Sequence, residues 1–202
     1  STTASITRAT LTVTGITANN KPYDGTPNAT LDTSGAALAG FVGSEDVTLT
    51  GGSATFDNQN VGTGKTVTGT GFGLGGADAG NYALGTVATT TADITAKPLT
   101  PTVTLNNKVY DGATTATTIA SRSLSGIVGS DDVNLGTSGT VAAFGSANVN
   151  SYTGIGVTGL SLSGTAAGNY QLSSTSTTAS ASITAKTVTG SFTADNKVYD
   201  GN

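Results

Sequence analysis

The sequence predicts an all-β fold built of tandem modules, and three observations lead to this prediction. Val, Ile and Thr alternate with other residues in short runs such as TLTVT at 10–14, which is typical of strands. Turn pairs such as Asp24–Gly25 recur roughly every 8–12 residues, as they do in β-sandwiches and barrels. The third observation is a period of about 88 residues, at which ASITRA (4–9) returns as ADITAK (92–97) and ASITAK (181–186).

Further short motifs keep the same period and set the module boundaries. The matched pairs are GSEDV (43–47) with GSDDV (129–133), Phe56 with Phe144, Asn60–Val61 with Asn148–Val149, and GNYAL (80–84) with GNYQL (168–172). We therefore predict one module over residues 10–97 and a second over 98–186. Residues 1–9 are predicted to be the last strand of a preceding module, and 187–202 the opening strands of an incomplete third. We expect 187–202 to pack on the second module or to pair with a neighbouring molecule.

Each module is interpreted as an immunoglobulin-like β-sandwich of roughly seven strands. Gly15 interrupts the first alternating run, so a bulge or register change is expected there. A single helical turn is expected within 75–82, since no window has a sustained helical period. DAGNY at 78–82 has the spacing of the tyrosine corner of immunoglobulin-like sandwiches, in which the tyrosine hydroxyl bonds to nearby backbone. Tyr82 and its match Tyr170 are predicted in this role, and a β-grasp-like sheet is the main alternative fold.

The hexapeptide NKxYDG occurs three times and is the main candidate site. It reads NKPYDG at 20–25 and NKVYDG at 107–112 and 196–201. Asp-Gly favours a turn, because Asp and Gly tolerate positive φ, and the preceding Asn can bond its own backbone. The motif is therefore interpreted as a structural corner. Its nine candidate residues are Tyr23, Asp24, Gly25, Tyr110, Asp111, Gly112, Tyr199, Asp200 and Gly201.

Several sharper hypotheses remain beside the structural one. No cofactor is predicted, and calcium is the alternative, because the repeated aspartate could supply one of its ligands. The pairs Glu45–Asp46 and Asp131–Asp132 are predicted to lie in solvated turns rather than to act as acid–base dyads, since neighbours on a strand point to opposite faces. An internal isopeptide bond would join Lys21, Lys108 or Lys197 to Asn81 or Asn169. Threonine-rich strands could also present a flat face to ice or glycans.

Composition argues against several classes of function. The chain has no His and no Cys, so it lacks an imidazole base, a thiolate nucleophile and the usual transition-metal ligands. No enzyme is therefore predicted. Its net charge is −4 and its eight basic residues are scattered, which argues against nucleic acid as a partner. No apolar run reaches the length of a membrane span, so no membrane insertion is predicted.

A family resemblance rests on NKxYDG near the start of a Gly- and Thr-rich module and GNY near its end. In these motifs the chain resembles the YDG-type repeats of very large bacterial surface proteins, including filamentous-haemagglutinin-like adhesins. The resemblance implies an extracellular or cell-surface stalk or fibre without catalytic residues. It implies the neighbouring modules of the same chain as partners, with identical chains in a filament as a further partner. The alternative function is that the repeats themselves bind a glycan or a protein.

Overall fold

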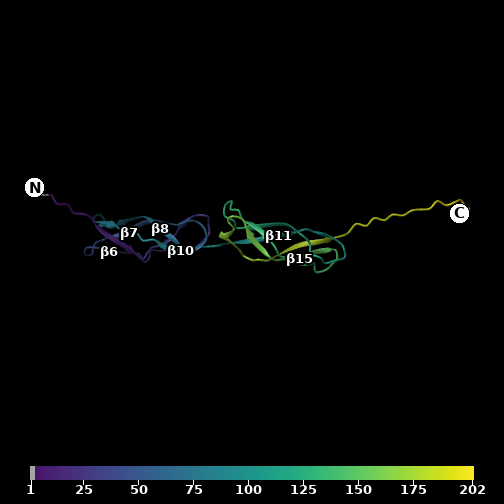
Figure 1. The fold of residues 1–202 in the computed structure, drawn as a ribbon, viewed down its shortest axis with the longest axis horizontal. Coiled ribbons are helices and arrows are strands. Elements are labelled where there is room, and N and C mark those ends of the chain that lie inside the picture. The colour runs from purple at the N-terminus through teal and green to yellow at the C-terminus, as the bar shows by residue number, and fades with distance from the viewer. Residues whose placement is uncertain (1–2) are drawn as a thin grey trace. The chain divides into compact units, whose positions relative to one another are not determined.

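The structure, a computed structural model, describes residues 3–202, and its regular elements are strands and two short 3-10 turns (Figure 1). The first repeat contains β1 (Ala9–Thr14), β2 (Thr17–Ala18), β3 (Lys21–Pro22), β4 (Asn28–Ala29), β5 (Leu31–Asp32), β6 (Ala37–Ala39), β7 (Thr48–Phe56), β8 (Gly62–Gly75), the 3-10 turn η1 (Ala79–Asn81), β9 (Tyr82–Leu84) and β10 (Thr90–Thr95). The second contains β11 (Lys97–Leu105), β12 (Lys108–Val109), β13 (Ile119–Ser125), β14 (Asn134–Thr137), β15 (Asn150–Val157), β16 (Leu160–Ser163), η2 (Ala167–Asn169), β17 (Tyr170–Leu172) and β18 (Thr177–Thr184).

Two sheets and a small ribbon form the first repeat. The larger sheet has the order β3-β10-β8-β7-β4, in which β7, β8 and β10 are antiparallel neighbours (Figure 1). The smaller sheet has the order β6-β1-β9, and β2 pairs with β5. In each main sheet one pairing is parallel, β1 with β9 and β3 with β10. Each of these pairs joins an early segment of the repeat to a late one.

The second repeat keeps much of this arrangement but divides it into smaller sheets. Its strands form the sheets β13-β11-β17 and β12-β18-β15 and the pair β14-β16. The parallel pairs recur at matched positions, β11 with β17 and β12 with β18. The prediction of an all-β fold of tandem repeats is therefore confirmed. Residues 3–202 contain no α-helix that could cover a sheet, so the structure does not support the β-grasp-like alternative.

Apolar positions matched between the two repeats make much of the core. The side chains buried most completely are Leu11, Leu99, Val67, Val157, Ile94 and Ile183, of which Leu11 with Leu99 and Ile94 with Ile183 are equivalent pairs. Burying such a side chain stabilises a fold by about 1.5–3 kcal/mol relative to leaving it exposed. The predicted helical turn within 75–82 is also found, as η1 and its equivalent η2. Gly15, at φ +78°, separates β1 from β2, where an interruption of the strand was expected.

The chain divides into two compact units whose borders are not those of the repeats. Unit 1 contains the chain up to Thr100 together with Leu124–Leu135 and Leu162–Ser173. Unit 2 contains Pro101–Ser123, Gly136–Ser161 and the chain from Ser174 onwards. Part of the second repeat thus packs in one unit with the first repeat.

The predicted strands at the chain termini are not formed. Residues 3–8 and 185–202 contain no strand, and Phe192 is 94% exposed. The expectation that 187–202 packs on the second repeat is therefore not met, whereas pairing with a neighbouring molecule stays a prediction. The reason lies in the pairing pattern, because β1 and β3 of the first repeat, which match 187–202, pair with later segments of the same repeat. The sequence holds no third set of those later segments.

A glycine in the turn before η1 provides a test of this fold. Gly76 has φ +100°, and a Cβ added there would collide with the carbonyl oxygen of Asp46, which accepts a hydrogen bond from the Asp78 N–H. We expect Gly76→Ala to destabilise the first repeat by about 2–4 kcal/mol, from backbone strain and the clash together. The measurement is urea unfolding followed by circular dichroism. Gly80→Ala is the control, because a Cβ at Gly80 would meet nothing within 4 Å; equal losses from the two substitutions would contradict the prediction.

Candidate functional site: the YDG corners and the joint between repeats

The YDG corners are held by a lysine–aspartate pair inside the motif. The Lys21 ammonium lies 2.8 Å from the Asp24 carboxylate, and the same oxygen of Asp24 accepts the backbone N–H and the hydroxyl of Thr26, each at 2.9 Å. In the second copy Lys108 lies 2.8 Å from Asp111, which accepts the Ala113 N–H at 2.9 Å. Lys197 and Asp200 make the same 2.8 Å pair. Each aspartate therefore closes a turn over the glycine that follows it.

The rest of the motif fixes the corner to the last strand of its own repeat. The Asn20 side chain accepts the Asp93 N–H at 2.7 Å, and the Tyr23 N–H donates to the Thr95 carbonyl at 2.9 Å. The second repeat repeats these bonds from Asn107 and Tyr110 to β18: the Asn107 side chain accepts a backbone N–H of β18 at 2.9 Å, and the Tyr110 N–H donates to a β18 carbonyl at 2.8 Å. Gly25 and Gly112 each have φ +79°, a conformation that favours glycine. The prediction of a structural corner thus agrees with the geometry of the motif.

The Tyr23 side chain contacts residues of the second repeat, all within unit 1. Tyr23 is 5% exposed, and its hydroxyl donates to the Asp131 carboxylate at 2.9 Å. The Tyr170 hydroxyl donates to the same carboxylate oxygen at 2.6 Å and accepts the Val128 N–H at 3.0 Å. The two tyrosine rings meet edge to face with centroids 5.3 Å apart, a favourable aromatic geometry. One carboxylate therefore holds a tyrosine from each repeat.

A second set of hydrogen bonds lies beside this tyrosine pair. The Asn169 carbonyl oxygen accepts the Val61 N–H at 3.0 Å, and the Asn169 amide donates to Asn60 at 3.3 Å. Asn169 belongs to the GNY motif of the second repeat, and Asn60–Val61 to a motif of the first. Four of the motifs that recur along the sequence therefore meet at one joint.

The apolar core continues through the joint. Leu99, Val133 and Tyr170 belong to the second repeat, yet they form one buried cluster with Tyr23, Phe56 and other core residues of the first. Their counterparts in the first repeat, Leu11, Val47 and Tyr82, form a small cluster of their own with Leu38, Leu74 and Ala79. The same three positions thus serve as a local core in one repeat and as part of a shared core in the next.

The paired acids have separate roles: the second acid of each pair lies in an exposed turn, as predicted, whereas the first is half-buried against a tyrosine. The first acid holds a tyrosine: Glu45 accepts the Tyr82 hydroxyl, as Asp131 accepts that of Tyr170. The second acid closes the turn before the 3-10 helix. Asp46 accepts the Ala77 N–H at 3.1 Å, and Asp132 accepts the equivalent N–H of Thr165 at 3.0 Å.

The tyrosine corner differs from the prediction in one respect. The hydroxyls of Tyr82 and Tyr170 do accept backbone N–H groups, but these belong to Val42 and Val128, 40 and 42 positions upstream. The expected partner was backbone close by in the sequence. The bond instead ties β9 or β17 to the loop before the acidic pair, and so closes one end of each repeat.

Comparison with known proteins agrees with this repeated geometry. The YDG domain matches the chain twice, over residues 7–92 and 95–179, and these matches cover most of the sequence. The chain belongs to the YDG domain family. No curated protein and no solved structure matches it. Within residues 3–202, no helix of the two YDG domains has the length and apolar character that a membrane crossing needs.

Charges around the YDG corners keep the aspartates ionised. Partial burial would raise the pKa of Asp24, but hydrogen bonds from Lys21 and Thr26 outweigh it and lower that pKa below the usual range. The hydrogen bond from Lys108 is the largest cause that lowers the pKa of Asp111, and the hydrogen bond from Lys197 acts in the same way on the pKa of Asp200. The corner aspartates are therefore carboxylates at neutral pH, bound to lysine.

The alternative chemistries find little support in the two YDG domains. The part of the chain that the structure describes contains no cluster of three or more His, Cys, Asp or Glu side chains that could hold a metal ion. Lys21 bonds Asp24 and Thr26, and Lys108 bonds Asp111, Ala113 and Thr115. Asn169 bonds the backbone of Val61 instead of a lysine. The lysine–asparagine pairs that an isopeptide bond needs are therefore not formed.

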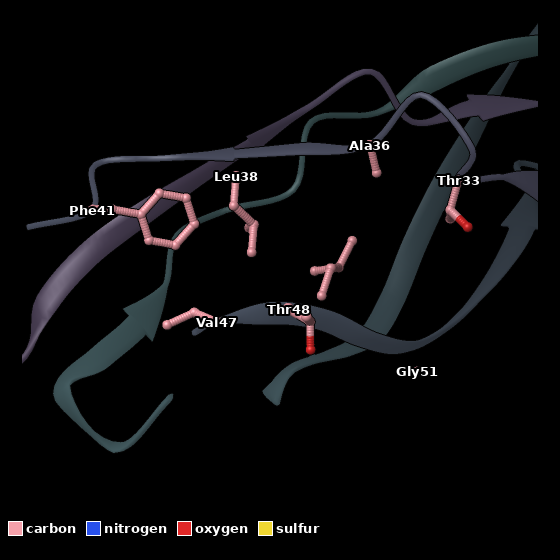
Figure 2. A pocket seen from close by; sticks show the side chains of 8 residues that line it. Thr33, Ala36, Leu38, Phe41, Val47, Thr48 and Gly51 are labelled. Atoms are coloured by element: carbon pink, nitrogen blue, oxygen red, sulfur yellow. The ribbon is translucent and has the colours of Figure 1, made fainter. Parts of the chain in front are cut away.

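The first YDG domain also contains an open pocket of about 340 Å³. Figure 2 shows Leu38 and Phe41 on one side of it and Val47 and Thr48 on the other. The remaining lining residues are Thr33, Ala36, Leu49 and Gly51, so none of the eight is ionisable. The pocket offers apolar contacts and threonine hydroxyls, but no group for acid–base chemistry.

The structure brings together only some of the candidate residues that the sequence singles out. Tyr23 and Tyr170 meet in the joint, whereas Tyr82 bonds Glu45 inside its own domain. Tyr110 is 42% exposed, and Tyr199 lies in the terminal segment without strands. Sequence analysis missed the role of Asp131 and Asn169 as partners of the preceding domain. The only signal for it was that their motifs recur with the same period as YDG.

The two copies of the YDG tyrosine provide a matched test of the joint. Tyr23→Ala removes a buried ring and leaves part of the hydrogen-bonding capacity of Asp131 unused, so we expect unit 1 to lose about 3 kcal/mol of stability. Tyr110→Ala removes the equivalent exposed ring, for which we expect a loss below about 1 kcal/mol. Urea unfolding followed by circular dichroism measures both. If the two variants lose the same stability, the Tyr23 ring does not stabilise the joint.

Alkaline titration tests the environment of Tyr170. Burial of the phenol and its hydrogen bond to Asp131 raise the pKa of Tyr170 to about 12 from a usual value of 10.0. Because this pKa is raised by folding, the stabilising contribution is complete below about pH 10 and is lost as the pH rises towards about 12. We expect stability to fall over that range, and the phenolate absorbance of the folded protein to contain a late component. Because the pKa of Tyr23 is raised as well, Tyr170→Phe should reduce the late component by the absorbance of one tyrosine; an unchanged late component would contradict the assignment to Tyr170.

Proposed function

We propose that this chain is a structural segment of an extracellular bacterial surface protein, in which YDG domains follow one another and space or assemble the parent protein outside the cell. One observation carries the proposal: the recurring motifs serve the joint between successive domains. Tyr23 and Asn60–Val61 of one domain bind Asp131 and Asn169–Tyr170 of the next. Recurring motifs whose residues join successive domains have a structural role.

The extracellular location and the adhesin-type parent rest on the resemblance of NKxYDG and GNY to repeats of bacterial surface proteins. Composition supports this proposal. Charged residues make up only 10% of the chain, and Gly, Ser and Thr fill many of the positions between core residues. The folded part is held by backbone ladders and small apolar side chains, without any disulfide, since the sequence has no Cys.

We propose no catalytic activity for the chain. The sequence has no His or Cys, and tyrosine is the polar group that the joint buries. Burial and the nearby Asp131 carboxylate raise the pKa of Tyr23 as well as that of Tyr170, so both phenols hold their protons at neutral pH. A phenol in that state donates a hydrogen bond to a carboxylate but does not act as a base. The proposed partners are neighbouring YDG domains, and neither nucleic acid nor insertion into a membrane forms part of the proposal.

Labelling of whole cells tests the location and the role. Antibodies raised against this chain, applied to intact cells that produce the parent protein, should bind the cell surface, and gold-labelled antibodies should lie away from the envelope in electron micrographs. Label that enters only after lysis would contradict an extracellular role. A glycan array probed with the full chain tests the alternative that the domains are themselves adhesive: specific binding would favour a binding module over a spacer.

Calcium dependence provides a further test. The recurring aspartates are bound to lysine, and the described residues form no cluster of metal-ligating side chains, so we expect calcium to leave stability unchanged. The measurement is the thermal midpoint of the full chain in calcium and in a chelator. A ligand that binds only the folded state at 100 times its dissociation constant would stabilise it by about 2.7 kcal/mol, which shifts the midpoint by several degrees. A shift of that size would show a calcium site and change the proposed role of the motif.

A further inference from the structure

Large apolar side chains are exposed at a few positions in the folded part of the chain, and these positions are related. Among the described residues from 9 to 184, the exposed ones are Phe41, Val42, Val109, Tyr110 and Val149. Isolated exposed apolar residues are common and need no explanation, whereas a set that shares a structural equivalence does. Each of these five is the counterpart, one period away, of a residue at or beside the joint.

Two of these exposed residues are the counterparts of residues that the second domain contributes to the joint. Phe41 and Val42 match Ile127 and Val128, which pack against the shared core cluster within unit 1. Val128 also approaches the YDG corner, since a Cβ on Gly25 would lie 3.0 Å from its side chain. In the first domain Val42 is 69% exposed. We name the set Phe41, Val42, Glu45 and Tyr82 the socket face.

The socket face has the hydrogen bonds of the joint already in place. Tyr82 accepts the Val42 N–H at 2.9 Å and bonds Glu45, as Tyr170 accepts the Val128 N–H and bonds Asp131. The Phe41 ring lies edge-on to Tyr82, with centroids 6.1 Å apart. What the socket face lacks, compared with the joint, is the tyrosine that Tyr23 supplies to Asp131.

The other three exposed residues correspond to the side that the first domain supplies. Tyr110 matches Tyr23, Val149 matches Val61, and Val109 matches Pro22 next to the buried tyrosine. The YDG corner that holds Tyr110 is already formed, with its Lys108–Asp111 pair and the Tyr110 N–H bonded to β18. A Cβ on Gly112 would meet nothing within 4 Å, whereas Gly25 lies against Val128. We name the set Val109, Tyr110, Asn148 and Val149 the plug face.

We propose that the plug face of one molecule docks on the socket face of a second molecule of the same chain and forms there the contacts of the internal joint. The Tyr110 hydroxyl then donates to Glu45 of the second molecule, and Val149 covers the apolar surface beside it. Asn148–Val149 meets Asn81 of the second molecule, as Asn60–Val61 meets Asn169 within unit 1. The proposal rests on the internal joint and does not depend on where the parent protein is located.

Geometry and affinity follow from this assignment. The two faces are different surfaces, so the contact is heterologous and produces open chains or rings of molecules rather than a closed pair. A small contact of this kind binds weakly between separate molecules, since the internal joint has the advantage of a covalent connection. We expect a dissociation constant on the order of 0.1–1 mM.

Sedimentation velocity of the full chain over a concentration series tests the proposal. The average mass should rise with concentration towards about 1 mM. Val42→Lys on the socket face and Tyr110→Ser on the plug face should each weaken association at least about tenfold. Both residues are exposed, so circular dichroism and the unfolding midpoint should stay unchanged in both variants. Phe192→Ser is the control. It removes a 94% exposed ring that belongs to neither face, so it should leave association unchanged.

A mixture of the two variants separates this interface from general stickiness. Val42→Lys keeps its plug face and Tyr110→Ser keeps its socket face, so the mixture should form pairs that contain one molecule of each and should not grow further. A single-molecule mass at all concentrations would overturn the proposal. So would association that neither variant weakens, association lost in Phe192→Ser, or a mixture that forms species larger than pairs.

Discussion

The Asp131 carboxylate, which accepts the hydroxyls of Tyr23 and Tyr170, is the interaction on which the arrangement of unit 1 depends. A charge-assisted hydrogen bond to a carboxylate is stronger than a bond between neutral groups, and a buried phenol left without a partner would cost about 1–3 kcal/mol. The tyrosine of one YDG domain is thus buried only in the presence of the acid from the next. The shared apolar cluster and the Asn169 bonds add to the same contact and give it a fixed register.

Sequence alone predicted the local parts of this structure. Alternation of β-branched residues located the long strands, the recurring motifs gave the repeats, and Asp-Gly marked the corners, because each of these signals depends on near neighbours in the chain. It did not predict the partners of the motifs. Tyr23 and Asp131 are 108 positions apart, more than one period, and nothing in a single sequence says that a motif binds the next repeat and not its own. The terminal strands were expected because their sequence repeats that of β1 and β3. They are absent because strand pairing is non-local and needs later segments of the same repeat.

The two domains show how the same end of a domain tolerates differences in sequence. The carboxylate that binds the tyrosine is Glu45 in the first domain and Asp131 in the second, and each reaches its tyrosine hydroxyl. Asp78 accepts the Asp46 N–H at 2.9 Å, whereas its counterpart Ala166 has no such group. The turn is kept in both domains because Asp46 and Asp132 bond the backbone N–H groups that follow their glycines. Asp46 and Asp132, which hold the turn, are therefore present in both domains. Asp78, which adds one further hydrogen bond, is present only in the first.

The YDG motif has two structural roles, and this explains why its three residues recur together. The aspartate and glycine shape a corner through bonds inside the motif, and this corner forms equally where the tyrosine is buried and where it is exposed. The corner positions the tyrosine, and in the first copy the Tyr23 side chain contacts the core of its own domain and residues of the next. A corner that forms without its partner presents a preorganised ring, and preorganisation lowers the entropy lost when the partner binds. The Tyr23 contact therefore stabilises the joint between two domains, whereas the corner itself depends on the lysine, the aspartate and the glycine.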